Sequence, residues 1–226
     1  TGIKNITLVT PSEWLASRVN ESFMNEYNLQ VINNGIDFNI FKPTVSNFRQ
    51  ENALEGKFLI LGVANIWEPR KGLRHFIELA RFLNEDEVIV LVGLPVKHQK
   101  GLPNNVLRIP KTSDARELVA IYTAADVFFN PTMEDTFPTT NLEALACGTP
   151  VVTFDTGGSA ESTDDGSGFV VEIGNLWGVQ ESIDEIRSDG KTFYVEHCVK
   201  RVKDHFNKRE RIQEYIDLYK RVGGTS

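Results

Sequence analysis

The sequence contains few cysteines, no long apolar run and no excess of positive charge, and each absence excludes a class of protein. Its 226 residues include two cysteines, Cys147 and Cys198. They cannot form a disulfide framework and show no metal-binding spacing, so we expect two buried thiols. The net charge of −7 argues against a nucleic-acid partner, whose binding surface would be basic. An anionic ligand would therefore need a local group of basic residues.

Long hydrophobic segments are also missing. The apolar runs FLILGVA and VIVLVG fall far short of the roughly 18–20 residues that a membrane span needs. The first residues lack the basic-then-apolar pattern of a signal peptide. We therefore expect a cytoplasmic protein that contacts membranes peripherally, if at all. The chain opens on a strand-like ITLVT and ends on GGTS, which favours a segment excised from a longer protein.

Short β-branched runs alternate with segments of helical periodicity along most of the chain. The runs FLILGVA, EVIVLVG, DVFFNP, VVTF and GFVV are apolar throughout, which is typical of strands covered on both faces. Helical patterns near residues 72–83 and 114–124 lie between them. This order predicts an α/β fold with a Rossmann-like, doubly wound parallel sheet.

The two ends of the chain differ from this pattern. Residues 1–43 predict a strand, a helix opened by Pro11 and Ser12, and a second strand that runs into a turn at Asn34–Gly35. We predict that they form a separate small unit and that residues 44–226 form the main domain. The last segment predicts C-terminal packing helices, with their charged faces set against an apolar set. That set is Phe206, Ile212, Ile216 and Tyr219.

Residues 130–161 hold the most informative polar pattern. An apolar strand ends at Pro131, and Pro138 with Thr139 and Thr140 opens a helix, a position that suits proline because the first helical N–H has no partner. Free amides at a helix start beside the carboxyl edge of a parallel sheet bind phosphate. Asp135 and Glu143 flank this point, and two acids beside a phosphate site suit a nucleotide sugar. A loop acid and an exposed helix acid with no ligand are the structural alternative.

The segment DTFPTTNLEALACGTPVV resembles the acid–seven residues–acid signature of the retaining family 4 glycosyltransferases, the glycosyl transferases group 1 with a GT-B fold. Asp135 matches the first acid, Phe137 the aromatic position and Glu143 the second acid. The matching tail consists of Gly148, Pro150, Val151 and Val152. The resemblance implies that the first acid contacts sugar hydroxyls and that the second holds the ribose.

The segment departs from the family pattern at two positions. Asp135 replaces a glutamate and so reaches one methylene less far, which leaves Glu134 as a competitor for the role. Pro138 replaces a glycine and lacks an N–H, so Thr139 and Thr140 are expected to supply the amides that approach the donor.

Three further segments match the family in order. LGVANIWEPRKGLRHFIELA is similar to a strand–loop–helix in which a basic pair neutralises the donor diphosphate. Lys71 falls on the family's lysine, while Asn65 stands near its missing arginine and Arg70 is a candidate substitute. The guanidinium group of arginine can donate hydrogen bonds to two phosphate oxygens at once, whereas the ammonium group of lysine acts as a point charge.

The other two matches concern the base and a glycine loop. VLRIPKTSDARELVAIYTAADVFFNPT resembles the segment that holds the base, which makes Ile109, Pro110 and Lys111 candidate base contacts. TGGSAE resembles the family's glycine loop and contains Gly157, Gly158 and Glu161. A turn after a strand explains the two glycines equally well.

The resemblance implies one half of a GT-B fold, with residues 1–43 as the remnant of the acceptor-side half and the interdomain hinge. It implies transfer from a nucleoside-diphosphate sugar to a glycan or lipid-linked acceptor with retention, without a metal or other cofactor. Without its acceptor-side domain the chain is expected to be inactive. A noncatalytic nucleotide-sugar-binding module is the alternative. A nicotinamide-dependent oxidoreductase is disfavoured, because no G-x-G-x-x-G follows a strand and opens a helix.

Overall fold

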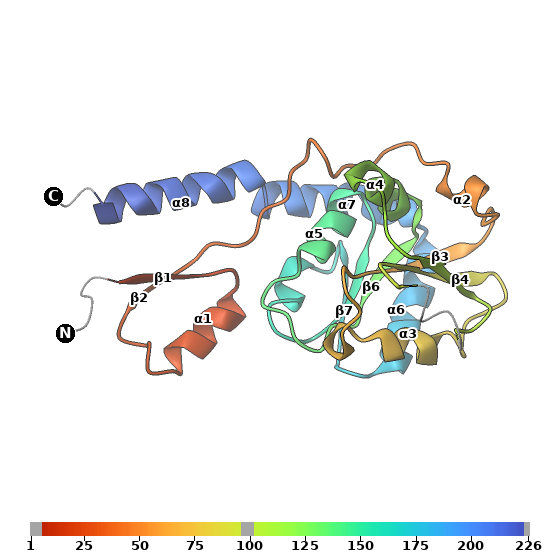
Figure 1. Cartoon of the computed structure of the whole chain (residues 1–226), viewed down its shortest axis with the longest axis horizontal. Helices are drawn as coiled ribbons and strands as arrows, with labels where there is room; N and C mark the ends of the chain where they lie inside the picture. Colours follow the sequence, from red (N-terminus) through yellow and green to blue (C-terminus); the bar gives the residue numbers. More distant parts are fainter. Residues whose placement is uncertain (1–5, 96–101, 224–226) are drawn as a thin grey trace.

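A computed structural model describes residues 6–95 and 102–223. Its centre is a parallel sheet with the strand order β5-β4-β3-β6-β7-β8 (Figure 1). The strands are β3 (Phe58–Val63), β4 (Glu87–Val92), β5 (Val106–Ile109), β6 (Val127–Asn130), β7 (Val151–Phe154) and β8 (Gly168–Val171). The chain runs outward from β3 to β5 and returns to β6 on the other side of β3. The predicted doubly wound sheet is confirmed.

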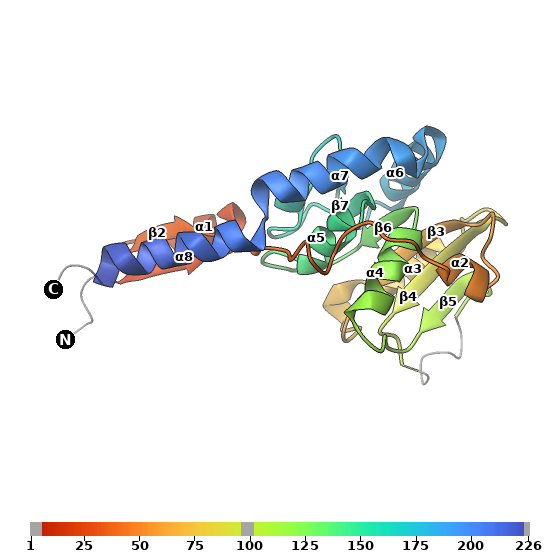
Figure 2. The same cartoon turned by 90° about the horizontal axis from the view of Figure 1, so that it is seen from above.

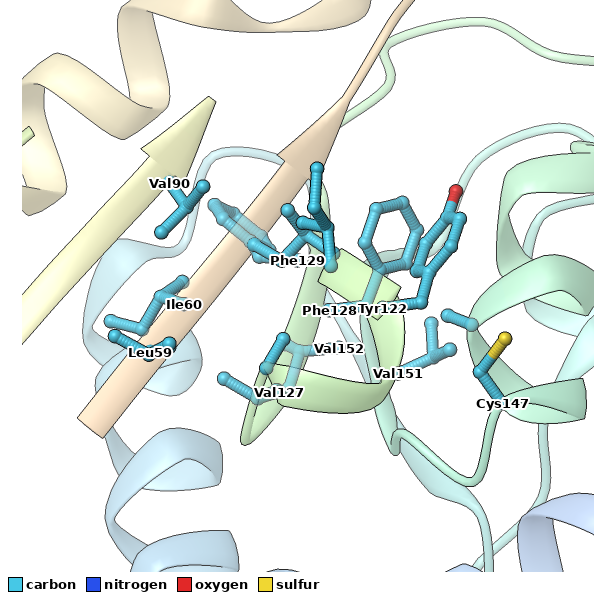
Figure 3. Packing of buried hydrophobic residues seen from close by; sticks show 14 of the residues in the cluster. Leu59, Ile60, Val90, Tyr122, Val127, Phe128, Phe129, Cys147, Val151 and Val152 are labelled. Atoms are coloured by element: carbon cyan, nitrogen blue, oxygen red, sulfur yellow. The ribbon is translucent and has the colours of Figure 1, made fainter. Parts of the chain in front are cut away.

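The apolar strands form the core because helices cover both faces of the sheet. Every residue of β6 and β7 is buried. Figure 3 shows Leu59 and Ile60 of β3 in one cluster with Phe128, Phe129 and Val152. The predicted buried thiols are also confirmed, since Cys147 and Cys198 are free and buried. Burial raises the pKa of each thiol to about 12.

The covering helices form two groups. They are α2 (Phe48–Glu51), α3 (Leu73–Leu79), α4 (Ala115–Ala124), α5 (Thr139–Ala146), α6 (Leu176–Asp189) and α7 (Lys191–His205). Helix α3 contacts α6, whereas α4 contacts α2 and α5, and α5 contacts α7. Right-handed crossovers in opposite directions place α3 on one face of the sheet and α4 with α5 on the other.

The helix near 114–124 is confirmed, and local chemistry explains where it begins. The carboxylate of Asp114 accepts hydrogen bonds from the amides of Arg116 and Glu117 at 2.8 and 3.0 Å, which satisfies two of the unpaired donors of the first turn. Helix α3 is shorter than the predicted 72–83 and ends at Leu79. Gly72 lies outside it because its backbone is left-handed, with a φ of 75°.

A second, smaller unit lies beside this domain. Strands β1 (Thr7–Thr10) and β2 (Asn28–Val31) form a separate parallel pair, and α1 (Glu13–Asn20) connects them. Ser12 caps α1 as predicted, accepting from the amide of Leu15 at 3.2 Å. Figures 1 and 2 show α8 (Lys208–Gly223) running alongside this unit, with the last turn of α8 and the first residues of β1 at the same end of the molecule.

The prediction that Ile212, Ile216 and Tyr219 pack inward is wrong. Phe206 is buried, but these three residues of α8 are 48%, 40% and 69% exposed. The reason is that α8 leaves the large sheet and contacts the small unit through another face, on which Leu218 is buried. Their apolar side chains are thus left partly exposed. No helix in those residues is both long and apolar enough to cross a membrane.

Candidate functional site

The site lies where the direction of strand addition reverses. Strands β3 and β6 are neighbours, but the chain leaves β3 toward β4 and leaves β6 toward β7. The loops after β3 and β6 therefore diverge above the carboxyl ends of these strands, which is where ligands bind in open α/β sheets. The loop after β3 includes the short 3-10 helix η1 (Pro69–Lys71), and the loop after β6 runs into α5.

These two loops are joined through their backbones. The amide of Met133 donates to the carbonyl oxygen of Arg70 at 2.7 Å. A Cβ added to Gly72 would lie 2.2 Å from the carbonyl oxygen of Pro131. The close contact requires glycine at this position, and it explains why glycine follows Lys71.

Lys71 and Asp135 form an ion pair at this junction, with 2.7 Å between Nζ and Oδ2. Their side chains are 27% and 16% exposed, so the pair is partly sheltered but reaches solvent. The other carboxylate oxygen of Asp135 accepts from the amide of Phe137 at 3.2 Å. The structure therefore brings the predicted phosphate-binding cation and the predicted sugar-binding acid into direct contact.

Arg70 and Glu134 lie beside this pair and face outward. The Nε atom of Arg70 is 2.8 Å from Oε2 of Glu68, and its Nη1 donates to the backbone oxygen of Glu134 at 3.3 Å. Glu134 thus supplies a backbone contact, whereas Asp135 supplies the carboxylate that meets Lys71. This geometry favours Asp135 over Glu134 as the acid of the site.

Helix α5 begins one residue later than predicted. Pro138 occupies the N-cap with a ψ of 115°, and Thr139 is the first helical residue. The extended ψ keeps Pro138 out of the helix. No side chain caps this helix start, so the amides of Thr139 and Thr140 remain available to an anion as predicted.

Glu143 lies one turn after Thr139, so both side chains lie on the same side of α5. Its Oε2 accepts a hydrogen bond from the hydroxyl of Tyr122 in α4 at 3.0 Å. Burial raises the pKa of Glu143 to about 7, against a smaller lowering by this hydrogen bond. Sequence analysis did not identify Tyr122, because its spacing in α4 fits an ordinary core position.

Phe137 has a structural place in this loop. Its side chain is 2% exposed and its ring lies 5.4 Å from that of Phe206, centroid to centroid. Its carbonyl oxygen accepts from the side-chain amide of Asn34 at 3.1 Å. We therefore expect Phe137 to shape the loop and to leave direct contact with a ligand to its neighbours.

The two glycines after β7 pack against the backbone of the same loop. A Cβ on Gly157 would lie 1.9 Å from the backbone oxygen of Asp135, and one on Gly158 would lie 2.1 Å from that of Thr136. The amide of Gly158 also donates to the oxygen of Asp135 at 3.0 Å. Their small size lets the backbone of the loop approach, while their contact with a donor stays a prediction.

Ile109, Pro110 and Lys111 lie farther from the ion pair. Ile109 ends β5, the edge strand of the sheet, and Pro110 and Lys111 follow it and are exposed. They share the carboxyl edge with the site. In the described parts of the chain, no hydrogen bond or ion pair joins them to Lys71, Asp135 or Glu143. Their role as base contacts stays a prediction.

A buried polar network holds these elements together, and sequence analysis missed it. Asn130 at the end of β6 donates to Oδ1 of Asn141 in α5 at 2.7 Å. Asn141 in turn donates to the hydroxyl of Ser162 at 2.8 Å, in the short helix η3 (Ala160–Ser162). The sequence signal that could have indicated this network is Asn130, a polar residue at the end of an apolar strand.

Glu161 is a further residue whose partners were not foreseen. Its two carboxylate oxygens accept from the amides of Glu13 and Trp14 at 2.9 and 2.8 Å. It therefore caps α1 of the small unit from the loop of the large sheet. As to metals, no group of three or more His, Cys, Asp or Glu that could hold an ion occurs within residues 6–95 and 102–223.

Solved structures identify the class of fold. Sucrose-phosphate synthase from Thermosynechococcus elongatus matches with a TM-score of 0.85 and 20% identity, over 97% of this chain and 59% of that one. Anabaena Alr3699/HepE in complex with UDP-glucose matches with a TM-score of 0.79 and 20% identity, over 93% and 62%. The sheet and its helices are those of a GT-B glycosyltransferase half.

The sequence itself identifies the family. Residues 45–211 match the family described as Glycosyl transferases group 1, so the chain belongs to this family. It is 24% identical over 220 residues to UDP-Gal:alpha-D-GlcNAc-diphosphoundecaprenol alpha-1,3-galactosyltransferase from Escherichia coli. It is 23% identical to N-acetyl-alpha-D-glucosaminyl L-malate synthase from Bacillus anthracis. The chain spans 56% and 60% of the length of these two relatives.

Proposed function

We propose that this chain forms the donor-binding half of a retaining glycosyltransferase. It would take a nucleoside-diphosphate sugar and deliver the sugar to a glycan or lipid-linked acceptor. The observation that carries the proposal is the Lys71–Asp135 ion pair at the switch point of the sheet, beside the uncapped start of α5. A cation, free amides and an acid at one crevice match the phosphates and hydroxyls of a nucleotide sugar.

In the proposed reaction, the bond between the anomeric carbon and the phosphate oxygen breaks, and its electron pair leaves with the nucleoside diphosphate. The acceptor's hydroxyl oxygen bonds to the same face of that carbon, and its proton passes to the departing phosphate oxygen. Lys71, Arg70 and the amides of Thr139 and Thr140 would stabilise the charge that develops. No metal is required in this proposal. Loss of one such preorganised donor raises a barrier by about 3–4 kcal/mol in comparable sites.

The acceptor side is proposed to lie mainly outside this chain. The chain spans less than two thirds of the relatives described above. The names of several relatives point to glycan or lipid acceptors, such as diacylglycerol for the Acholeplasma laidlawii processive glucosyltransferase, which is 28% identical over 157 residues. We propose the same broad acceptor class here. Uridine diphosphate sugars are the first donors to test, because two comparison proteins are named for them.

Removal of Lys71 tests the site directly. We expect Lys71→Ala to lower the affinity for UDP-glucose, GDP-mannose or ADP-glucose, whichever the wild-type chain binds. The loss should be about 10–100-fold, because a hydrogen bond to a charged group contributes about 1.5–3 kcal/mol. Isothermal titration calorimetry measures the affinity.

Lys220→Ala is the matched control, since Lys220 lies exposed on α8 and should leave binding unchanged. Asp135→Ala should weaken binding of the sugar nucleotide more than binding of the nucleotide alone. Equal affinities of Lys71→Ala and the wild-type chain would contradict the proposed function.

A further inference from the structure

Tyr122 places a hydroxyl group inside the apolar core. The residue is fully buried, and its ring packs edge-on against Phe128 with centroids 5.6 Å apart. Figure 3 shows the ring beside Phe128, with its oxygen at the border of the cluster. A phenylalanine would fill the same space. A buried hydroxyl destabilises the fold unless it finds a partner.

The partner of this hydroxyl is the candidate donor site. Among the described residues, the hydroxyl of Tyr122 donates its hydrogen bond to Oε2 of Glu143, at 3.0 Å. The backbone of Tyr122 is tied to the same region, since its carbonyl oxygen accepts from the hydroxyl of Thr149 at 2.6 Å. Thr149 lies between α5 and β7. Tyr122 is therefore held at both ends against the element that carries Glu143.

We infer that Tyr122 is a positioning residue of the donor site: its hydroxyl orients the Glu143 carboxyl group and favours the ionised form that accepts the donor's ribose hydroxyls. This inference rests on the proposed function. It goes further by assigning a role to a core residue that does not itself meet the donor.

The surroundings of Glu143 explain why its ionised form requires a hydrogen bond from Tyr122. Burial raises the pKa of Glu143 to about 7, and the hydrogen bond from Tyr122 lowers it. The other titratable groups nearby are Cys147 of α5, which interacts with both Glu143 and Tyr122, and Lys191 of α7, which interacts with Cys147. A carboxylate accepts stronger hydrogen bonds than a neutral acid. Donor affinity should therefore rise as the pH rises through about 7.

Tyr122→Phe tests the inference through the pH profile of binding. Loss of a hydrogen bond to a charged group should raise the pKa of Glu143 by about one unit. The ionised fraction at pH 7 would then fall from about one half to about one tenth. We expect the affinity for UDP-glucose, GDP-mannose or ADP-glucose to fall about fivefold at pH 7 and to return nearly to wild type at pH 9. Tyr219→Phe on the exposed face of α8 is the control and should leave the profile unchanged.

A structural role for Tyr122 predicts something different. It would lower affinity equally at every pH, and that result, or an unshifted midpoint, overturns the inference. Carboxyl NMR titration of Glu143 in the two proteins gives the same test without any ligand. If Tyr122→Phe does not fold, Glu143→Gln tests the titration on which the inference depends: a flat pH profile supports Glu143 as its source, and a wild-type profile overturns the inference. Absence of binding by the wild-type chain at all pH values, with the NMR shift present, overturns the proposed function but keeps the Tyr122–Glu143 coupling.

Discussion

Lys71 and Asp135 are 64 residues apart in the sequence and meet across two loops. Gly72 makes this meeting possible, because its left-handed backbone turns the chain and its missing side chain admits the carbonyl oxygen of Pro131. A single glycine thus determines where the cation of the site lies. We expect Lys71 and Asp135 to reach a ligand only when the backbone at Gly72 keeps this left-handed turn.

Gly72→Ala should therefore destabilise both the fold and the site. Gly56 is the matched control, since its φ of 71° is similar but a Cβ there meets nothing within 4 Å. We expect Gly56→Ala to lower the free energy of unfolding by about 1–2 kcal/mol, the strain of a left-handed backbone, and Gly72→Ala to lower it by more.

Urea denaturation of both variants measures the difference, and calorimetry with the nucleotide that the wild-type chain binds follows the site. Gly72→Ala should lose at least tenfold in affinity, while Gly56→Ala should not. Equal losses of stability in the two variants would show that the contact with Pro131 is relaxed easily.

Between elements, the loops of the large sheet support one another and reach the small unit. The glycines after β7 lie against the backbone of Asp135 and Thr136, and four residues beyond Gly157 the carboxylate of Glu161 caps α1. One short segment therefore contacts both the donor loop and the helix of the other unit. The carboxylate of Glu161 thus links α1 to the segment whose glycines contact the backbone of Asp135 and Thr136.

Glu161→Ala should loosen α1. The change leaves the amides of Glu13 and Trp14 without an acceptor, and lost hydrogen bonds to a charged group contribute about 1.5–3 kcal/mol. Hydrogen exchange at these two amides should become faster by at least tenfold, while amides of the sheet keep their wild-type rates.

Glu161→Gln should have a smaller effect, because one oxygen remains to accept. The control is Glu181→Ala, an exposed residue of α6, for which no change is expected. Unchanged exchange at Glu13 and Trp14 in Glu161→Ala would exclude this capping role.

For the whole molecule, the loops that carry the candidate site extend from the large sheet, whereas α8 and the β1–α1–β2 unit extend away from it (Figure 1). The exposed stripe of Ile212, Ile216 and Tyr219 lies on this extension. The molecule thus combines one complete sheet with a small unit that contains two strands. We therefore expect that experiments on this chain can detect binding of a donor even where an acceptor is not positioned for transfer.

The chain alone should bind a nucleotide sugar and transfer little or none of it. Positioning two reactants lowers a barrier by as much as about 7–11 kcal/mol, and the proposed acceptor side lies mainly elsewhere. Incubation with UDP-glucose and a panel of glycan and lipid acceptors, with detection of released UDP, checks this. Rapid transfer by the 226-residue chain would contradict it.

Much of the fold could be predicted because its signals are local. Apolar runs mark the buried strands, Asp114 and Ser12 mark helix starts, and proline marks the start of α5 to within one residue. The candidate segment could be singled out because its acids and glycine follow one another at short spacing. Such patterns depend on neighbours within a few residues, and these are visible in the chain itself.

The pairings within the site depended on the tertiary structure. Lys71 meets Asp135, Tyr122 meets Glu143 and Glu161 meets α1 because strand order and helix packing decide which loops lie together. The inward packing predicted for α8 was wrong for the same reason. An apolar stripe on a helix predicts a contact surface, but it does not identify the element that packs against it. The sequence by itself therefore determined the elements and the chemical groups of this protein, and only the folded arrangement decided their partners, because contacts across long separations follow from topology.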